Sequence, residues 1–411
     1  MFGRPIDKED IMQERTRVLV VGGGYAGITA ANRVAGGDAV DVTLVNARPV
    51  FVERIRLHQL AAGSDDAVVE YEDVLGPSVR LVVDTVTRID AAGRQVRLAS
   101  GGALGYDYLV YAVGSGSPLS VVPGAAEHAL PVAELTDAER LRTALAAAGP
   151  DAAVTVVGGG PAGIETAAEL AESGHAVTLL CGGDLGPSLH PRARRSVARS
   201  LDSLGVHVED GPGSRVVAVA EDAVTLADSR VVPSAITVWT TGFSLPALAR
   251  DSGLSTDADG RLLTDETLTS VDDERIVAAG DAAAPSGVPL RMSCQAAGPL
   301  GGGAADTILA RLRGEQPKPF TMGFVGLCLS LGRRQGVVQF EHRDDTATRV
   351  SVAGRSGARI KELICRGTVF SLRLEARRPG ATRLPAAIGD PQRRRSLSSA
   401  AAQPVAGGGR G

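Results

Sequence analysis

Two stretches of the chain carry the same glycine-rich pattern, and this duplication strongly constrains the fold. The first, VLVVGGGYAGITAANRVA, spans residues 18–35, and the second, VTVVGGGPAGIETAAELA, spans residues 154–171. In each, an apolar run leads through G-x-G-x-x-G into a segment with helical periodicity. A further apolar run follows, VTLV at 42–45 and VTLL at 177–180. The order of strand, turn, helix and strand predicts two βαβ units of the Rossmann type.

The glycines of each motif have separate physical tasks. Gly22 permits the tight turn, Gly24 lets the backbone approach a pyrophosphate, and Gly27 allows the helix to lie close to the strand. The corresponding residues of the second motif are Gly158, Gly160 and Gly163. Free N–H groups at the start of each predicted helix would form an anion site. One such motif alone is a weak signal, whereas two in this context indicate two nucleotide sites.

The composition is typical of a globular chain that acts on small molecules. The 411 residues suffice for two or three domains, and 44% hydrophobic residues can bury a core in each. A formal net charge of -4 and only 3% aromatic residues argue against nucleic acid as a partner. The chain shows neither a secretory signal nor an apolar stretch long enough to span a membrane. We expect a cytoplasmic protein, with peripheral attachment to a membrane as the open alternative.

We expect an α/β fold with two Rossmann-like three-layer dinucleotide-binding domains, for FAD and NAD(P)H, and a small C-terminal α+β domain. The last domain is indicated by alternating apolar residues followed by a helix around ARIKELICRG. The end of the chain is rich in Ala, Gly, Pro, Ser and Arg, which predicts disorder. The expected units are residues 17–115 with 240–315 for the first domain, 116–239 for the second, 316–376 for the third, and 377–411 for a disordered tail.

Two nucleotide sites in one chain suggest that two different nucleotides are held face to face. Electron transfer from a nicotinamide to a flavin requires this arrangement. The duplication therefore predicts a flavoprotein reductase, in which the reduced flavin passes its electrons to a second substrate.

Five ordered motifs carry a resemblance to known proteins. They are GGGYAG, YAVGSG at 111–116, GGGPAGIETAAEL, VWTTGF, and AAGDAAA followed by MSCQAAGPLGGGAAD. Over residues 17 to about 315 the chain resembles the pyridine nucleotide-disulfide reductase superfamily, and within it the type-two NADH dehydrogenase-like branch. The resemblance implies FAD at the first glycine loop, NAD(P)H at the second, and a quinone or other small organic electron acceptor.

The resemblance also implies which residues bind the cofactors. Asp281 would hydrogen-bond the ribityl chain, although a helix cap is an alternative role for this side chain. The main-chain N–H groups of Gln295 and Ala296 would face the isoalloxazine C2 carbonyl. The implied cofactor-binding residues are Gly22, Gly24, Tyr25, Ala26, Gly27, Asn46, Ala112, Gly114, Gly158, Gly160, Pro161, Gly163, Gly242, Gly280, Asp281, Gln295 and Ala296.

Two residues are implied to serve the reaction itself. Glu165 would lie near the nicotinamide and flavin edge and orient them, or would simply be an acid favoured by the helix dipole. Gln295 is the one glutamine kept from a glutamine-rich quinone helix, in which Pro299 and Leu300 replace the later glutamines. The quinone assignment therefore stays open. The alternatives are a reductase of a small redox protein such as ferredoxin, and a flavin-binding interaction protein with vestigial turnover.

Several departures from the family pattern leave further choices open. Asn46 stands where an acid usually binds the adenosine ribose, but an amide can still donate and accept hydrogen bonds. Cys181 and two glycines follow the second unit, so NADPH is permitted beside NADH. The four cysteines are scattered, so we expect no metal site and no dithiol relay, and the roles of Cys294 and Cys365 stay open. The C-terminal domain predicts a homodimer.

The segment FVERIRLHQLAAG at 51–63 carries three basic side chains after the first unit. Arg54, Arg56 and His58 could place charge near the flavin, or could form one solvated face of a helix. A lone histidine is more often structural, so we do not assign His58 to catalysis.

Overall fold

The first glycine motif follows the central strand of a parallel five-stranded sheet in the computed structural model, which describes residues 15–119, 122–383, 389–390 and 393. The strands, in spatial order, are β19 (Ile276–Ala278), β9 (Tyr108–Tyr111), β1 (Thr16–Val21), β2 (Val40–Asn46) and β5 (Val79–Val83). All neighbours run parallel, so both faces of the sheet must be covered.

Helices cover one face of this sheet and a small antiparallel sheet covers the other. Helices α1 (Tyr25–Val34) and α9 (Cys294–Leu312) lie side by side, and Gly301 allows their close contact because a Cβ there would stand 2.1 Å from the Ala26 carbonyl oxygen. The opposite layer consists of β6 (Val86–Asp90), β7 (Gln95–Leu98) and β8 (Ala103–Gly105). Apolar side chains of both sheets, such as Leu19 and Val96, form one core between them.

The second glycine motif follows the central strand of a second parallel sheet with the same plan. Its strands, in spatial order, are β10 (Ala129–Pro131), β17 (Ile236–Trp239), β11 (Ala153–Val157), β12 (Ala176–Leu180) and β13 (His207–Glu209). The covering helices are α5 (Leu135–Ala148), α6 (Pro161–Glu172) and α7 (Pro191–Ser203), and the antiparallel layer is β14 (Val216–Val219), β15 (Ala223–Leu226) and β16 (Val231–Pro233). The predicted pair of Rossmann-like α/β units is confirmed.

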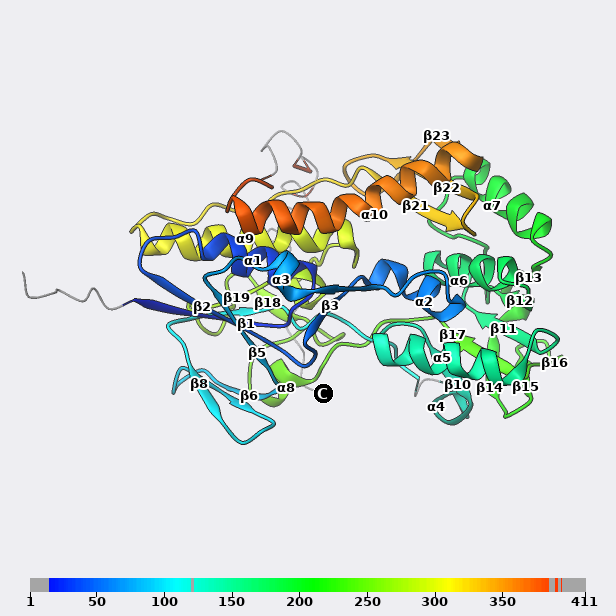
Figure 1. Cartoon of the computed structure of the whole chain (residues 1–411), viewed down its shortest axis with the longest axis horizontal. Coiled ribbons are helices and arrows are strands. Elements are labelled where there is room, and N and C mark those ends of the chain that lie inside the picture. Colours follow the sequence, from blue (N-terminus) through cyan, green and yellow to red (C-terminus); the bar gives the residue numbers. More distant parts are fainter. Residues whose placement is uncertain (1–14, 120–121, 384–388, 391–392, 394–411) are drawn as a thin grey trace, which may run out of the picture.

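The C-terminal unit is an antiparallel sheet with one long helix. Strands β21 (Gly326–Leu331), β22 (Gln335–Glu341) and β23 (Ala347–Ala353) precede α10 (Gly354–Arg377). The helix contains the predicted ARIKELICRG segment but is much longer, and it runs from the C-terminal sheet across α1 of the first unit (Figure 1). It therefore contacts both the C-terminal sheet and helices α1 and α3 (Tyr71–Val74) of the first unit.

The remaining elements connect these layers. They are β3 (Val50–Val52), β4 (Val68–Glu70), β18 (Leu262–Thr264), β20 (Ala283–Pro285), α2 (Leu57–Ala62), α3 (Tyr71–Val74), α4 (Ala125–His128), α8 (Leu248–Asp251) and the 3-10 turns Arg54–Arg56, Pro212–Ser214 and Gly280–Ala282. Strand β19 enters the first sheet after the whole second unit, which supports the proposed discontinuous first domain.

The expected tail at 377–411 is described only in part. Arg393 forms an ion pair with Glu266 (3.0 Å) and donates to the Pro285 carbonyl (3.0 Å), while Arg383 forms an ion pair with Asp306 (2.9 Å). The prediction of disorder from residue 377 is therefore too broad at these positions, because arginines that can reach carboxylates hold the chain there. Residues 384–388, 391–392 and 394–411 lie outside the described residues.

Glu375 fastens α10 to α1 through a buried ion pair. Its Oε1 accepts from Arg33 Nε (2.7 Å) and its Oε2 accepts from the Thr382 backbone N–H (2.9 Å), and its side chain is 0% exposed. Removing one partner of a buried pair typically costs about 3–5 kcal/mol because the other charge stays buried. We predict that Glu375→Ala lowers the free energy of unfolding, measured in urea, by about 3 kcal/mol.

Glu315 provides the matched control for this prediction. It pairs with Arg313 at 2.9 Å on the surface, so Glu315→Ala should leave the free energy of unfolding nearly unchanged. If both variants lose the same free energy of unfolding, the buried pair stabilises the protein no more than the surface pair does.

Candidate functional site

A cavity of about 370 Å³ opens where strands of the first sheet end. Ligands of open parallel sheets bind at this carboxyl edge. The second unit contributes Ala162 and Trp239, so one space is shared by both nucleotide-type units. The predicted residues that line it are Gly22, Gly24, Tyr25, Ala26, Asn46, Ala112, Gly114, Gly242, Gly280 and Asp281. The other predicted residues, Gly27, Gly158, Gly160, Pro161, Gly163, Glu165, Gln295 and Ala296, are not among its described lining residues.

The first glycine loop has the geometry of a ligand cradle. Gly22 has a φ of +104°, and a Cβ on Gly27 would stand 1.8 Å from the Gly22 carbonyl oxygen, so glycine is needed at both positions. Gly24 is different, because no described atom lies within 4 Å of the place its Cβ would take. A side chain at Gly24 would therefore fill only the space left for a ligand.

The second loop repeats this geometry. Gly158 has a φ of +126°, and a Cβ on Gly163 would stand 1.9 Å from the Gly158 carbonyl oxygen. Gly160 again faces space that is free of described atoms within 4 Å. Both loops thus precede a helix N-terminus and leave room for a phosphate to approach the backbone. The residues present fit two dinucleotides.

Asn46 and Tyr71 hold the first loop in position. The Asn46 Oδ1 accepts from the Gly23 N–H (3.0 Å), and the Tyr71 hydroxyl donates to the Gly23 carbonyl (2.9 Å). Asn46 also donates to the Arg48 carbonyl (3.0 Å), so its amide fixes the loop from inside the cavity wall. The sequence pointed to Asn46 but not to Tyr71, which comes from a distant helix with no motif of its own.

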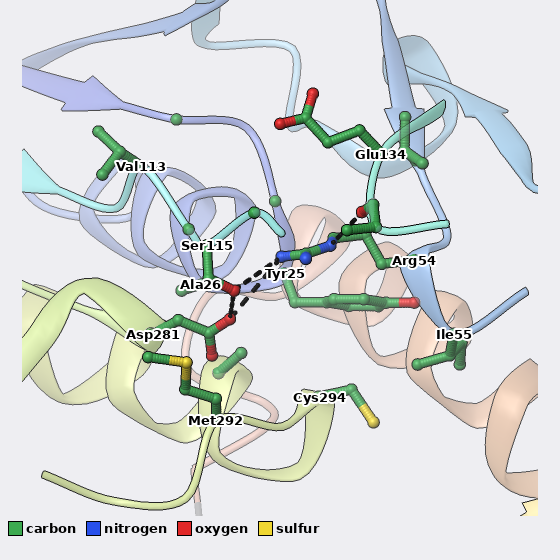
Figure 2. Close-up of a pocket in the computed structure, with 18 of the residues that line it drawn as sticks. Tyr25, Ala26, Arg54, Ile55, Val113, Ser115, Glu134, Asp281, Met292 and Cys294 are labelled. Carbon is green, nitrogen blue, oxygen red and sulfur yellow. Dashed lines mark hydrogen bonds and ion pairs between the residues drawn. The ribbon is translucent and has the colours of Figure 1, made fainter. Parts of the chain in front are cut away.

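Asp281, Ser115 and Arg54 form a polar corner of the cavity (Figure 2). The Asp281 Oδ2 accepts from Ser115 Oγ at 2.6 Å and lies 3.7 Å from Arg54 Nη1. Arg54 also donates to the Ala133 carbonyl (3.1 Å). Asp281 makes no capping hydrogen bond within its short 3-10 turn, so the alternative role as a cap is not seen. Its carboxylate instead faces the cavity, where a sugar hydroxyl could donate to it.

The three basic residues at 54–58 do not share a solvated face. Arg54 lies in the cavity wall, whereas Arg56 and His58 are buried. Arg56 is enclosed by carboxylates, with Glu362 at 3.1 Å and Glu53 at 3.4 Å. The solvated-helix alternative is wrong because α2 packs against α5 and α6, and Arg56 is paired with Glu362 of α10.

The start of α9 meets the cavity with Cys294 and Ala297. The Ala296 N–H is engaged by Ser293, whose Oγ accepts from it at 3.3 Å, so this N–H does not point freely at a ligand as predicted. The Gln295 amide bonds to the backbone before β21, accepting from Val325 N (2.7 Å) and donating to Gly326 O (2.9 Å). Gln295 therefore joins α9 to the C-terminal unit.

Glu165 belongs to a buried polar cluster beside the cavity. Its Oε1 accepts from the Ser330 N–H (2.8 Å) and lies 3.0 Å from Lys361 Nζ. His58 Nε2 is 3.1 Å from Ser330 Oγ. Burial acts to raise the pKa of Glu165, but the Lys361 charge and the Ser330 N–H outweigh it, and the pKa is lowered. Burial lowers the pKa of His58 to about 4, so His58 is neutral near pH 7.

The cysteines near the cavity are protonated thiols. Burial raises the pKa of Cys294, and it raises that of Cys365 to about 11. Both are free, and in the part of the chain that the structure describes no group of three or more His, Cys, Asp or Glu could hold a metal ion. No described helix has the length and hydropathy needed to cross a membrane.

Known proteins share this sequence and architecture. Residues 16–299 match the family model for pyridine nucleotide-disulphide oxidoreductases. The chain is 34% identical over 318 residues to the NADH dehydrogenase-like protein MT1860 of Mycobacterium tuberculosis, across 70% of this chain and 78% of that protein. It is 27% identical over 404 residues to a type II NADH:quinone oxidoreductase of Staphylococcus epidermidis, across 88% and 96% of the two chains. The structure of NDH2 from Plasmodium falciparum with NADH shares the fold, with a TM-score of 0.73, 15% identity and coverage of 90% and 100%.

Glycines that face open space and glycines that contact the backbone should respond differently to substitution. Gly24→Ala and Gly160→Ala place a methyl group in open space, so the free protein should keep its thermal stability. They should weaken binding of the nucleotide at the altered loop at least tenfold, or about 1.4 kcal/mol, as measured by titration of the apoprotein with FAD and of the FAD-loaded protein with NADH.

Gly27→Ala and Gly163→Ala serve as the contrast. Their methyl groups would collide with carbonyl oxygens, so we predict a loss of about 1–3 kcal/mol in the free energy of unfolding before any ligand is added. If the four variants behave alike, Gly24 and Gly160 do not mark the ligand side of the loops.

Proposed function

Because the chain belongs to the pyridine nucleotide-disulphide oxidoreductase family, we propose that it transfers electrons from NADH through FAD to a quinone or another small organic acceptor. Membership of the family makes it a flavoprotein oxidoreductase that uses a pyridine nucleotide. One observation supports the proposed electron transfer between two bound nucleotides most directly. The cavity that begins at the Gly24 loop is closed by Ala162 and Trp239 of the second unit, so two nucleotides bound at the two loops can meet there.

The residues of the chain would bind and orient the reactants. When bound, FAD supplies a ring that takes up two electrons from a reduced nicotinamide and gives them to a second substrate. The two glycine loops would hold the phosphates, and Asp281, which is held by Ser115 and lies near Arg54, would accept from hydroxyl groups of the cofactor. Holding two reactants in fixed relative positions accounts for much of the rate that such a site can produce.

Carboxylates beside the second loop favour NADH over NADPH. Asp210 and Asp184 act with burial to raise the pKa of Cys181 to about 12, which places both near the end of β12. Negative charge there repels the 2′-phosphate of NADPH. Arg194 neutralises part of this charge by pairing with Asp184 at 2.9 Å, and the backbone of Arg215 passes close to Gly182, so the preference must be measured.

The wall formed by α9 supports a small apolar acceptor. Met292, Cys294 and Ala297 line the cavity there, and their apolar or weakly polar surfaces suit a flat ring such as a quinone. Pro299 and Leu300 lie further along the same helix, in place of the glutamines of the quinone pattern. The proposed acceptor is therefore a small, flat organic molecule of the quinone class.

Anaerobic stopped-flow mixing tests this proposal. The FAD-loaded protein should bleach on addition of NADH, at least tenfold faster than with NADPH at equal concentration. Subsequent mixing with menadione should restore the yellow colour, whereas ferredoxin should not. A folded protein that takes up no FAD would contradict the whole assignment, and rapid reoxidation by ferredoxin alone would favour the reductase of a small redox protein.

We propose that Glu165 is a positioning residue rather than a catalytic one, because it touches the C-terminal unit and does not line the cavity. Glu165→Gln should lower the free energy of unfolding by roughly 3 kcal/mol, since Lys361 keeps a buried charge without a full partner. Adding Lys361→Met removes that charge and should restore most of the stability. If Glu165 positions the reactants, the double variant regains its melting temperature but not the wild-type rate of acceptor reduction. Full recovery of both would leave Glu165 with a structural role alone.

The homodimer and the cytoplasmic or membrane-peripheral location stay predictions from the sequence. Light scattering at micromolar concentration and fractionation of cells expressing the chain would test them.

A further inference from the structure

A second cavity, of about 610 Å³, lies between the β21–β22 turn and the first half of α10. It shares no lining residue with the first cavity among the described positions. We call this space the basic basin, because its wall is dominated by cationic side chains. Its lining residues with ionisable side chains are Arg333, Arg334, Arg355, Arg359, Lys361, Glu362, Cys365 and Arg366.

Acids neutralise only part of the charge in the basic basin. Lys361 is matched by Glu165 at 3.0 Å. Glu362 is shared, since Arg366 Nε lies 2.9 Å from it and Arg333 Nη2 lies 3.3 Å from it. A further acid, Glu172, accepts from the Arg333 backbone N–H at 2.5 Å, so this carboxylate binds the backbone of the β21–β22 turn.

Three arginines of the basin have no such partner. Within the described part of the chain, no ion pair or side-chain hydrogen bond joins Arg334, Arg355 or Arg359 to another residue. Like charges gathered in one concave space repel each other, and the repulsion is relieved when an anion enters. The rest of the molecule does not share this excess, because the whole chain has a formal net charge of -4.

The shape and chemistry of the basin narrow the class of anion. Guanidinium groups present paired N–H donors that match two oxygens of a phosphate, and several around one space can bind a multiply charged anion. The wall is also fixed in place. The β21–β22 turn is fastened to α6 by Glu172, and the helix side is fastened by Glu362, which pairs with Arg56 at 3.1 Å.

We propose that the basic basin is a binding site for a phosphate group, carried either by a soluble phosphate compound or by the headgroup of an anionic lipid. Arg355, Arg359 and Arg334 supply the free charge, and Arg333 and Arg366 can add donors at the rim. Leu363, which lines the basin and is 71% exposed, offers an apolar contact that a lipid would use and a free phosphate would not. The proposal goes beyond the proposed electron transfer, because the basin and the first cavity share no described lining residue.

Two binding measurements on the FAD-loaded protein distinguish the sources. NAD⁺ is kept in excess so that both glycine loops are occupied. Calorimetric titration with pyrophosphate at constant ionic strength tests the soluble source. Sedimentation with vesicles of phosphatidylcholine, with and without phosphatidylglycerol, tests the lipid source. We expect saturable binding in at least one arm.

The variant Arg355→Gln/Arg359→Gln should weaken that binding at least tenfold. Both side chains are exposed, so the fold should be kept, and unchanged reduction of the flavin by NADH checks this. Arg97→Gln/Arg349→Gln is the matched control, since it removes two exposed arginines outside the basin and should leave binding unchanged.

Three results would overturn the proposal. They are the absence of binding in both arms, an equal loss of binding in the control variant, and displacement of the ligand by chloride alone at the same ionic strength. Binding in only one arm, with loss in the basin variant alone, would support the site and identify its source.

Discussion

The closeness of a helix to the strand before it is the constraint on which this molecule depends. At Gly27 and at Gly163, a carbonyl oxygen from the preceding turn occupies the place that any side chain would need. Only with that contact can the helix begin directly above the strand end, with its N–H groups turned toward a phosphate. The chain meets this condition twice, once in each nucleotide-type unit.

The features that could be predicted from the sequence are those encoded within short, continuous segments. Glycine spacing and apolar periodicity indicated both parallel sheets, the C-terminal sheet with its helix, and Gly24 in the cavity wall, while the family resemblance implied Asn46 and Asp281. These features are encoded within short segments, where a turn or a buried strand leaves a readable pattern. Part of the polar corner was also predicted, because the sequence indicated that Arg54 could place charge near the flavin.

The parts that were missed depend on contacts between distant segments. Nothing near Glu165 in the sequence indicates that Ser330 and Lys361 will surround it, and the same is true of Tyr71 beneath the first loop. Arg56 and His58 were ambiguous because their partners come from distant segments, Glu362 of α10 for Arg56 and Ser330 of β21 for His58. The contact of the Ala296 N–H with a flavin stays a prediction, and the Ser293 side chain, three residues earlier, accepts from this N–H in the structure.

Helix α10 connects the two nucleotide-type units through buried ion pairs at two points. Lys361 ties it to α6 of the second unit and Glu375 ties it to α1 of the first, with both bonds buried. Lys361 and Glu375 are fourteen positions apart, a distance of about 21 Å along the helix. A wide hinge motion of one unit against the other would have to break a buried charge pair at one end. The two buried pairs therefore oppose a wide opening of the shared cavity, whose lining includes the exposed Phe243.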